Sequence, residues 1–146
     1  MRRLLSVGVA LLLLIGFAPD RATAQQGSAD RKTGFQLRGN YPNPFNPTTT
    51  IAFELGEELF RDGKPVEVSI RILSVLQQLV AVPTAMNHPE GNGVLVHKLL
   101  YTEPGEKLAF WDGKDRTGRK VASGIYYYQL VVNGKAAPVM RMVVTK

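Results

Sequence analysis

The chain has 146 residues, a formal net charge of +6 and no cysteine. This length supports one hydrophobic core of ordinary size, so we expect a single folded domain. The absence of cysteine excludes disulfides, thiolate metal sites and a lipid-bearing N-terminal cysteine. The densest basic group, Arg116, Arg119 and Lys120, falls in a predicted turn, which favours a solvated surface over a nucleic-acid site.

The N-terminus has the order of a secretory signal peptide. Residues 1–3 include two arginines, residues 4–18 are uncharged, and residues 22–24 read Ala-Thr-Ala, the small-residue pattern that precedes a cleavage site. The apolar run is shorter than the roughly 20 residues that cross a bilayer. We therefore predict a signal peptide over residues 1–24, cleavage before Gln25, and an exported mature chain without a transmembrane segment.

Residues 25–34 contain Ala29 as their only apolar side chain apart from glycine, and we predict a flexible linker there. From residue 35 to residue 146 the pattern changes to short apolar stretches separated by Gly, Pro, Asn and Asp. This pattern is typical of an all-β domain, so residues 35–146 are expected to form the folded unit.

The clearest predicted strand is residues 65–73, where apolar and polar side chains alternate so that one face is apolar. A similar alternation covers residues 51–55, preceded by three threonines. Residues 125–132 are apolar on both faces and are expected to form a central strand, followed by a tight hairpin turn at Asn133-Gly134. The other candidates are residues 79–82, 94–100, 108–111 and 139–144. About seven strands at this spacing predict an immunoglobulin-like antiparallel β-sandwich.

Residues 40–49 read Asn-Tyr-Pro-Asn-Pro-Phe-Asn-Pro-Thr-Thr. Three prolines fix φ and remove three backbone donors, so this segment cannot be a central strand and is expected to be a stiff extended lead-in. Phe45 is expected to fill one end of the sandwich. A rigid cap is favoured over a proline-rich peptide ligand because Pro44 and Pro47 adjoin predicted core.

Residues 111–118 read Trp-Asp-Gly-Lys-Asp-Arg-Thr-Gly, and their Asp-Gly and Thr-Gly pairs mark turns. Asp112 and Asp115 are expected to cap turns, since the alternating oxygen ligands and closing glutamate of a calcium loop are missing. Trp111, the only tryptophan, is expected to anchor the core at a strand end rather than to stack on a sugar.

The inventory of catalytic side chains is poor. The two histidines are His88, in a predicted loop, and His97, which we expect to be an ordinary strand residue. No serine, cysteine or carboxylate pair has the spacing of a catalytic site, and glycine-rich phosphate loops and paired metal-ligand spacings are absent from the sequence. We therefore expect no enzymatic activity, metal or cofactor.

Four motifs occur in the order that one protein family shows. They are the proline-rich segment, the Trp111-Asp112-Gly113 turn, the Ser-Gly-Ile-Tyr run at residues 123–126 and the ending at residues 140–146. From residue 35 onward the chain resembles the C-terminal sorting domain of proteins exported by the type IX (Por) secretion system, which is related to the immunoglobulin-like domain of the flagellar hook-capping protein. The resemblance implies a seven-stranded sandwich that is recognised by outer-membrane secretion machinery and often cleaved with transfer to surface lipopolysaccharide. It implies passage through the inner membrane to the periplasm and then to the outer surface or the medium. The residues that it implies for recognition or for the structural motifs are Tyr41, Pro42, Asn43, Pro44, Phe45, Asn46, Pro47, Trp111, Asp112, Gly113, Gly124, Tyr126, Met142 and Lys146.

The chain departs from the family pattern in three ways. No cargo domain is expected between the signal peptide and the sandwich. Residues 75–78 read Val-Leu-Gln-Gln where the family has a turn glycine, so a turn with positive φ is less favoured. The connection over residues 85–106 is long and has room for an extra hairpin around residues 103–105.

The leading hypothesis is a non-enzymatic domain recognised by the type IX machinery, with the proline-rich segment and the last strand as contacts. The alternative is an extracellular or periplasmic protein-interaction or adhesion module without a sorting role, acting for example by strand addition at an exposed sheet edge. A hook-cap-like assembly role ranks third because a cleavable signal peptide does not suit export through a flagellar apparatus.

Overall fold

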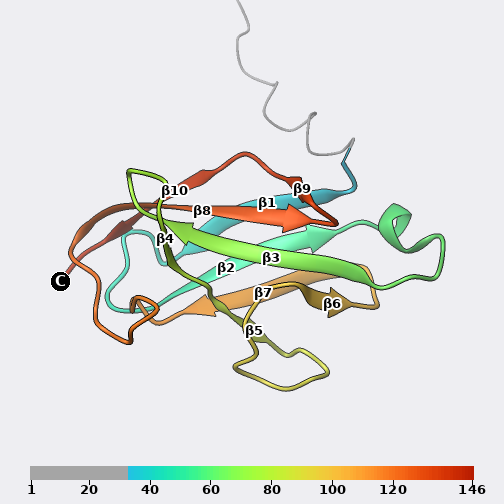
Figure 1. Ribbon diagram of the computed structural model, residues 1–146, viewed down its shortest axis with the longest axis horizontal. Helices are drawn as coiled ribbons and strands as arrows, with labels where there is room; N and C mark the ends of the chain where they lie inside the picture. The colour runs from blue at the N-terminus through green and yellow to red at the C-terminus, as the bar shows by residue number, and fades with distance from the viewer. Residues whose placement is uncertain (1–32) are drawn as a thin grey trace, which may run out of the picture.

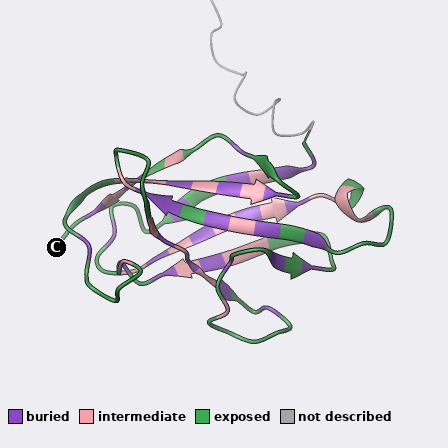
Figure 2. Cartoon of the chain, in the orientation of Figure 1, coloured by how far each residue is buried: buried purple, intermediate pink, exposed green. Residues whose placement is uncertain are grey.

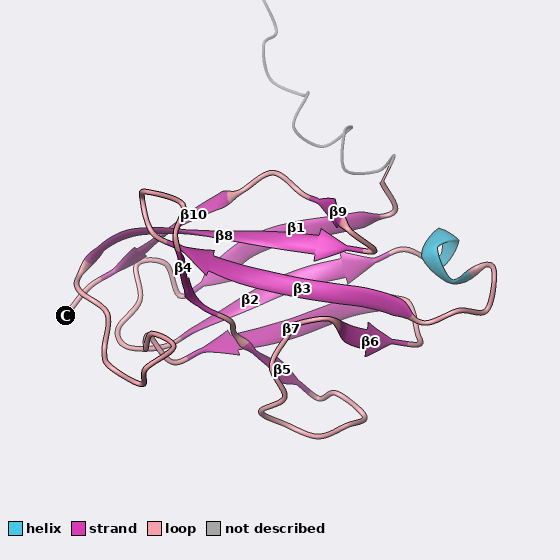
Figure 3. Ribbon diagram, viewed as in Figure 1, coloured by secondary structure: helices cyan, strands magenta, loops and turns pink. Residues whose placement is uncertain are grey.

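The computed structural model describes residues 33–146, in which ten strands and one short 3-10 helix are arranged in two layers (Figures 1 and 3). The predicted signal peptide and residues 25–32 of the predicted linker lie outside the described residues. No helix within residues 33–146 has the length and apolarity needed to cross a bilayer. The elements are β1 (Phe35–Tyr41), β2 (Thr49–Leu55), the 3-10 helix η2 (Glu57–Phe60), β3 (Val66–Leu73), β4 (Leu79–Ala81), β5 (Thr84–Met86), β6 (Leu99–Tyr101), β7 (Gly105–Trp111), β8 (Gly124–Val132), β9 (Lys135–Ala136) and β10 (Met140–Val144).

The two layers are antiparallel sheets. The first has the strand order β1-β2-β7-β5, and the second has the order β10-β8-β3-β4, with β6 also paired to β3 and β9 to β8. Buried side chains of both sheets form one hydrophobic core. The expected all-β sandwich is therefore confirmed.

Alternating burial explains why the best-predicted strands form where they do. In β2 and in the first seven residues of β3, every second residue is buried, and the strands of the sandwich are banded in burial colour accordingly (Figure 2). Val66, Val68, Ile70 and Ile72 have no exposed surface. A strand with one apolar and one polar face is stable only at the boundary between core and solvent. Both strands were predicted from this alternation.

The run over residues 125–132 lies inside β8, which has β10 on one side and β3 on the other. Its central position was predicted from its two apolar faces. The turn that follows has φ values of 48° at Asn133 and 79° at Gly134, and it joins β8 to the antiparallel β9. These are the positive φ values that a two-residue hairpin requires, so the predicted hairpin turn is confirmed.

Two strands of the first sheet were not predicted. β1 lacks a clear alternation because its pairing with β2 shifts register between Leu37 and Asn40, which is the mark of a bulge. β5 has only three residues. Both are edge strands, where burial imposes the weakest pattern on the sequence.

The region between β5 and β7 differs most from expectation. Of the strand predicted over residues 94–100, only Leu99 and Leu100 are in β6, because the chain bends at residues 96–98, where Lys98 has a φ of 51°. His97 is therefore an exposed residue in a bend, and its assignment as a strand histidine is wrong. The hairpin suggested around residues 103–105 is also wrong, since β6 pairs with β3 in the second sheet whereas β7 pairs with β2 and β5 in the first.

Candidate functional site

Four segments meet at one end of the sandwich, the end at which the chain terminates in Figure 1. They are residues 41–48 between the end of β1 and β2, residues 74–78 between β3 and β4, residues 111–126 from the end of β7 to the start of β8, and residues 140–146, which include β10. We call these four segments together the motif end. All of the family-like motifs lie there.

The proline-rich segment ties the two sheets together at the motif end. Its Phe45 N–H donates to the Val143 carbonyl at 3.0 Å, and the Phe45 carbonyl accepts from the Thr145 N–H at 2.9 Å. The Asn43 side-chain oxygen also accepts from the Val143 N–H at 3.0 Å. Because residues 41–48 connect β1 to β2 in the first sheet and β10 belongs to the second, the segment closes the gap between the sheets.

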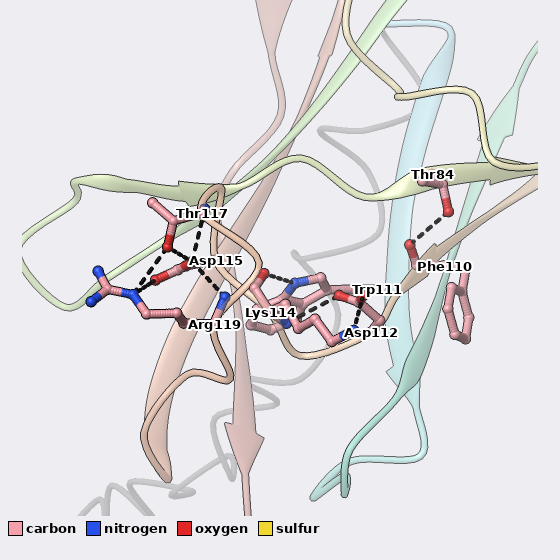
Figure 4. A network of polar contacts seen from close by, with 8 residues as sticks. All are labelled: Thr84, Phe110, Trp111, Asp112, Lys114, Asp115, Thr117 and Arg119. Atoms are coloured by element: carbon pink, nitrogen blue, oxygen red, sulfur yellow. Dashed lines mark hydrogen bonds and ion pairs between the residues drawn. The ribbon is translucent and has the colours of Figure 1, made fainter.

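Phe45 of this segment is the first of three aromatic rings that form a row at the motif end. Phe45 and Trp111 meet edge to face with ring centroids 5.4 Å apart, and Trp111 and Tyr126 do so at 5.9 Å. Trp111 is 2% exposed, and its indole N–H donates to the Lys114 carbonyl at 2.9 Å (Figure 4). Phe45 thus fills the end of the sandwich and Trp111 anchors the core at the end of β7, as the sequence predicted.

Gly113 is where the two main motifs touch. A Cβ atom at this position would lie 2.4 Å from the Pro47 carbonyl oxygen, and the backbone φ is +72°. Both conditions require glycine. The Gly113 carbonyl also accepts from the Val121 N–H at 2.9 Å, which closes the base of the following turn.

The turn over residues 112–119 is held by its own aspartates (Figure 4). Asp112 accepts from the Lys114 N–H at 3.0 Å. Asp115 accepts from the Thr117 hydroxyl at 2.6 Å, the Thr117 N–H at 2.8 Å and the Arg119 N–H at 3.1 Å. The Thr117 hydroxyl, followed by the Arg119 backbone, stabilises the carboxylate and lowers the pKa of Asp115. Both aspartates cap turns, as predicted.

The residues that the family resemblance implied fall into two groups by exposure. Packing accounts for Phe45, Trp111, Gly113 and Met142, which are buried, and in part for Tyr126. Tyr41, in contrast, is 81% exposed at the end of β1. The remaining exposed members are Pro42, Asn43, Pro44, Asn46, Pro47, Asp112, Gly124 and Lys146.

The turn over residues 74–78 forms without the family glycine. Gln77 takes a φ of 59°, and its N–H donates to the Ser74 carbonyl at 2.9 Å. The Ser74 hydroxyl oxygen accepts from the N–H groups of Leu76 and Gln78, both at 3.2 Å. These bonds hold an L-residue in the left-handed region despite its strain.

Sequence reasoning missed one feature of this end. Val75 and Leu76, at the tip of the β3–β4 hairpin, are 62% and 75% exposed. In the sequence, this feature is visible only as an apolar pair inside a predicted turn. Two grooves, of about 540 Å³ and about 560 Å³, flank the turn over residues 114–120, the first toward β5 and the second toward this hairpin.

The histidines lie away from the motif end. The buried His88 contacts the Leu100 carbonyl through Nε2 at 2.9 Å, and its Nδ1 accepts from the Glu90 N–H at 3.1 Å. Its ring also packs edge to face on Tyr101 with centroids 4.8 Å apart. These contacts hold the loop around His88 against β6. Within residues 33–146, histidine, aspartate and glutamate side chains form no group of three that could hold a metal ion.

No protein-family model matches the chain, and no curated protein matches it with significance. Among solved structures, a region of dimeric latent PorU from Porphyromonas gingivalis superposes with a TM-score of 0.52 and 22% identity, covering 76% of this chain and 9% of PorU. PorZ from Porphyromonas gingivalis, described as an essential surface component of the type IX secretion system, gives a TM-score of 0.43 and 20% identity, covering 83% of this chain and 13% of PorZ. This chain thus spans a small part of either protein. The likeness to PorU is one of fold.

Proposed function

We propose that this chain is a non-enzymatic, exported recognition domain of the type IX secretion pathway, related in role to the C-terminal sorting domains of that pathway. In this proposal the motif end is the surface that outer-membrane secretion machinery binds, and the protein reaches the outer surface or the medium. The observation that carries the proposal is the exposure of Tyr41 at an end of the sandwich otherwise built by the family-like motifs.

Packing explains the buried motif residues, but it does not explain Tyr41. The segment that follows Tyr41 is fixed from within, since the Pro42 carbonyl accepts from the Thr49 hydroxyl at 2.9 Å and from the Asn40 side-chain amide at 3.2 Å. The backbone on the C-terminal side of the exposed ring is therefore held in place. Tyrosines presented on a preorganised surface are common anchors of protein interfaces, because they bury a large area at a small entropic cost.

The fold adds support of a limited kind. A β-sandwich also occurs in part of PorU, but a fold by itself does not define a function. The case for the type IX pathway therefore depends on four sequence motifs in the family order, together with an exposed surface that those motifs build.

The proposal can be tested with a reporter domain inserted after Lys32 in the otherwise complete chain. The protein is expressed in a bacterium with a type IX system and in a matched strain that lacks its translocon. We expect surface-exposed or released reporter in the first strain only. Mass spectrometry of the product then shows whether its C-terminus is processed or carries a glycolipid.

Tyr41→Ala is the informative variant, because it removes an exposed ring without touching the core. We expect its melting temperature to match that of the wild type while export falls. Leu100→Ala is the matched control, since Leu100 is also exposed but lies on β6, outside the motif end. An unprocessed wild-type fusion confined to the periplasm of both strains would overturn the proposal and favour an interaction module without a sorting role.

A further inference from the structure

The groove between the β3–β4 hairpin and residues 115–122 has a volume of about 560 Å³ and combines apolar and basic surface. Val80, Val121 and Tyr126 contribute apolar lining, and Arg116, Arg119 and Lys120 contribute positive charge. The exposed Val75 and Leu76 belong to the same hairpin that lines one side of the groove. Apolar and cationic contacts are therefore available in one place.

Charge is distributed unevenly along the molecule. Of the charged side chains in residues 33–146, the motif end has six lysines and arginines and two carboxylates, while the rest has seven lysines and arginines and eight carboxylates. The motif end is thus strongly positive, and the remainder is slightly negative. A positive end steers the molecule toward a negatively charged partner surface.

Two of the cations beside the groove are available to a partner. Lys114 and Arg119 lie near Asp112 and Asp115, at N–O distances of 3.6 Å and 3.8 Å. In the described part of the chain, neither Arg116 nor Lys120 is in an ion pair.

The backbone that presents these cations is fixed. The Arg116 N–H donates to the Val80 carbonyl at 3.0 Å, so the turn is attached to β4 across the groove. The Asp115 N–H donates to the Arg119 carbonyl at 2.8 Å. A partner would meet a preformed site and would not need to order this loop.

We propose that the groove binds an acidic segment of a partner protein that also carries an apolar side chain. Arg116 and Lys120 would pair with the carboxylates. The apolar side chain would contact the β3–β4 hairpin, whose Leu79 and Val80 line the groove and whose exposed tip carries Val75 and Leu76. An open groove between a hairpin and a turn suits an extended chain segment that lies along it and contacts both sides. The groove indicates the chemistry of the partner. That the partner belongs to the secretion machinery rests on the proposed function.

The first test measures binding of a labelled peptide rich in Glu and Asp with one central Leu to the whole exported chain, by fluorescence polarisation. Arg116→Glu combined with Lys120→Glu should weaken binding by about tenfold or more, and added salt should weaken wild-type binding. The control is Lys64→Glu combined with Lys135→Glu, which makes the same charge change at exposed positions outside the motif end. The control should bind as the wild type does.

The second test separates the apolar contact from the charge. Leu76→Ser changes no charge at an exposed turn, and it should weaken binding of the Leu-containing peptide but not of the same peptide with Ser in place of Leu. A peptide with Gln in place of Glu and Asn in place of Asp should bind the wild type at least about tenfold more weakly. An equal loss of affinity in both double charge variants would overturn the proposal, because it would show that the peptide is attracted by the net charge of the protein and not by a specific site. Binding of anionic vesicles but not of the acidic peptide would also overturn it, in favour of a lipid surface.

The export assay keeps this inference distinct from the proposed function. Export of the wild-type reporter together with absent peptide binding would reject the groove and leave the proposed function standing. Peptide binding that depends on Arg116, Lys120 and Leu76, together with a reporter that never leaves the periplasm, would support the groove and reject the type IX role.

Discussion

The motif end and the connection over residues 87–104, which includes β6, are fixed in different ways. At the motif end, Asn43 and Phe45 bond to Val143 and Thr145, about a hundred residues further along the chain. In the connection, His88 bonds to Glu90 and Leu100, close in sequence, and residues 96–101 bond to β3 within a single sheet. The bonds of Asn43 and Phe45 join the two sheets and exist only when both sheets are in place, so the motif end is complete only in the fully folded chain. As the recognition surface proposed above, the motif end would distinguish folded protein from unfolded protein.

The largest expected effect comes from removing the central ring of the aromatic row. Trp111→Ala should lower the free energy of unfolding by about 3 to 5 kcal/mol, because it leaves a cavity between Phe45 and Tyr126. Urea denaturation followed by circular dichroism measures this loss. The exposed Leu100→Ala should change stability by less than about 0.5 kcal/mol. Equal and small effects at the two positions would remove the contrast between the motif end and the connection.

A matched pair of glycines tests the contact between the two motifs. Gly113→Ala places a methyl group against the Pro47 carbonyl at a φ of +72°, and we expect a loss of about 2 to 4 kcal/mol from strain and steric overlap together. Gly118 has a φ of +83° but open space around it, so Gly118→Ala should cost only the backbone strain, about 1 kcal/mol. Thermal melting of both variants separates the two contributions. Similar losses of stability in the two variants would mean that the Pro47 carbonyl moves away from the added methyl group at little energetic cost.

Two buried tyrosines should respond with opposite signs to the loss of their hydroxyl groups. The Tyr128 hydroxyl accepts from the Asn40 N–H at 3.0 Å and donates to the Arg38 carbonyl at 2.9 Å, so Tyr128→Phe should cost about 1 to 3 kcal/mol. The buried Tyr101 hydroxyl, on β6 beside His88, has no hydrogen-bond partner in the described part of the chain. Tyr101→Phe should therefore raise stability by about 1 kcal/mol, as measured by urea denaturation.

The pH dependence gives an independent check on Tyr101. Burial raises its pKa from 10.0 to about 12, so the folded state disfavours the phenolate. The stabilising effect of keeping Tyr101 protonated is complete below pH 10 and is lost as the pH rises toward about 12. In that range, the wild type should lose stability faster than Tyr101→Phe does. Parallel curves would show that the hydroxyl reaches solvent.

Sequence periodicity was sufficient for the strands that form the centre of the sandwich. β2, β3 and β8 were predicted because burial on one or both faces leaves a strong pattern. It was insufficient for β1, where a bulge interrupts the alternation. It was also insufficient for residues 94–100, where the chain bends between the buried Val96 and Leu99 and so does not continue as a strand.

Many residues of the candidate site were named from the sequence, but Val75, Leu76 and the geometry of the site were not. The motif residues were known from the family resemblance, yet the spacing of Pro47 and Gly113 along the chain gives no sign that they touch. The sequence also did not separate Tyr41, which is exposed, from Phe45, which is buried, although both are aromatic residues of one proline-rich segment. Those distinctions depend on the pairing of β2 with β7 and on contacts between the two sheets, which local patterns do not encode.

The smallest expected effect is at the turn that forms without its glycine. Gln77 has a φ of 59°, and Gln77→Gly removes the strain of an L-residue in the left-handed region at the cost of a more flexible unfolded chain. We expect a net gain of about 0.5 to 1 kcal/mol, measured as a shift in the urea midpoint. Because Val75 and Leu76 are unchanged, acidic-peptide binding should be retained in this variant. If the variant is more stable but no longer binds the peptide, the groove requires the strained conformation of this hairpin. Peptide binding at the motif end would then depend on the backbone angle of a single residue.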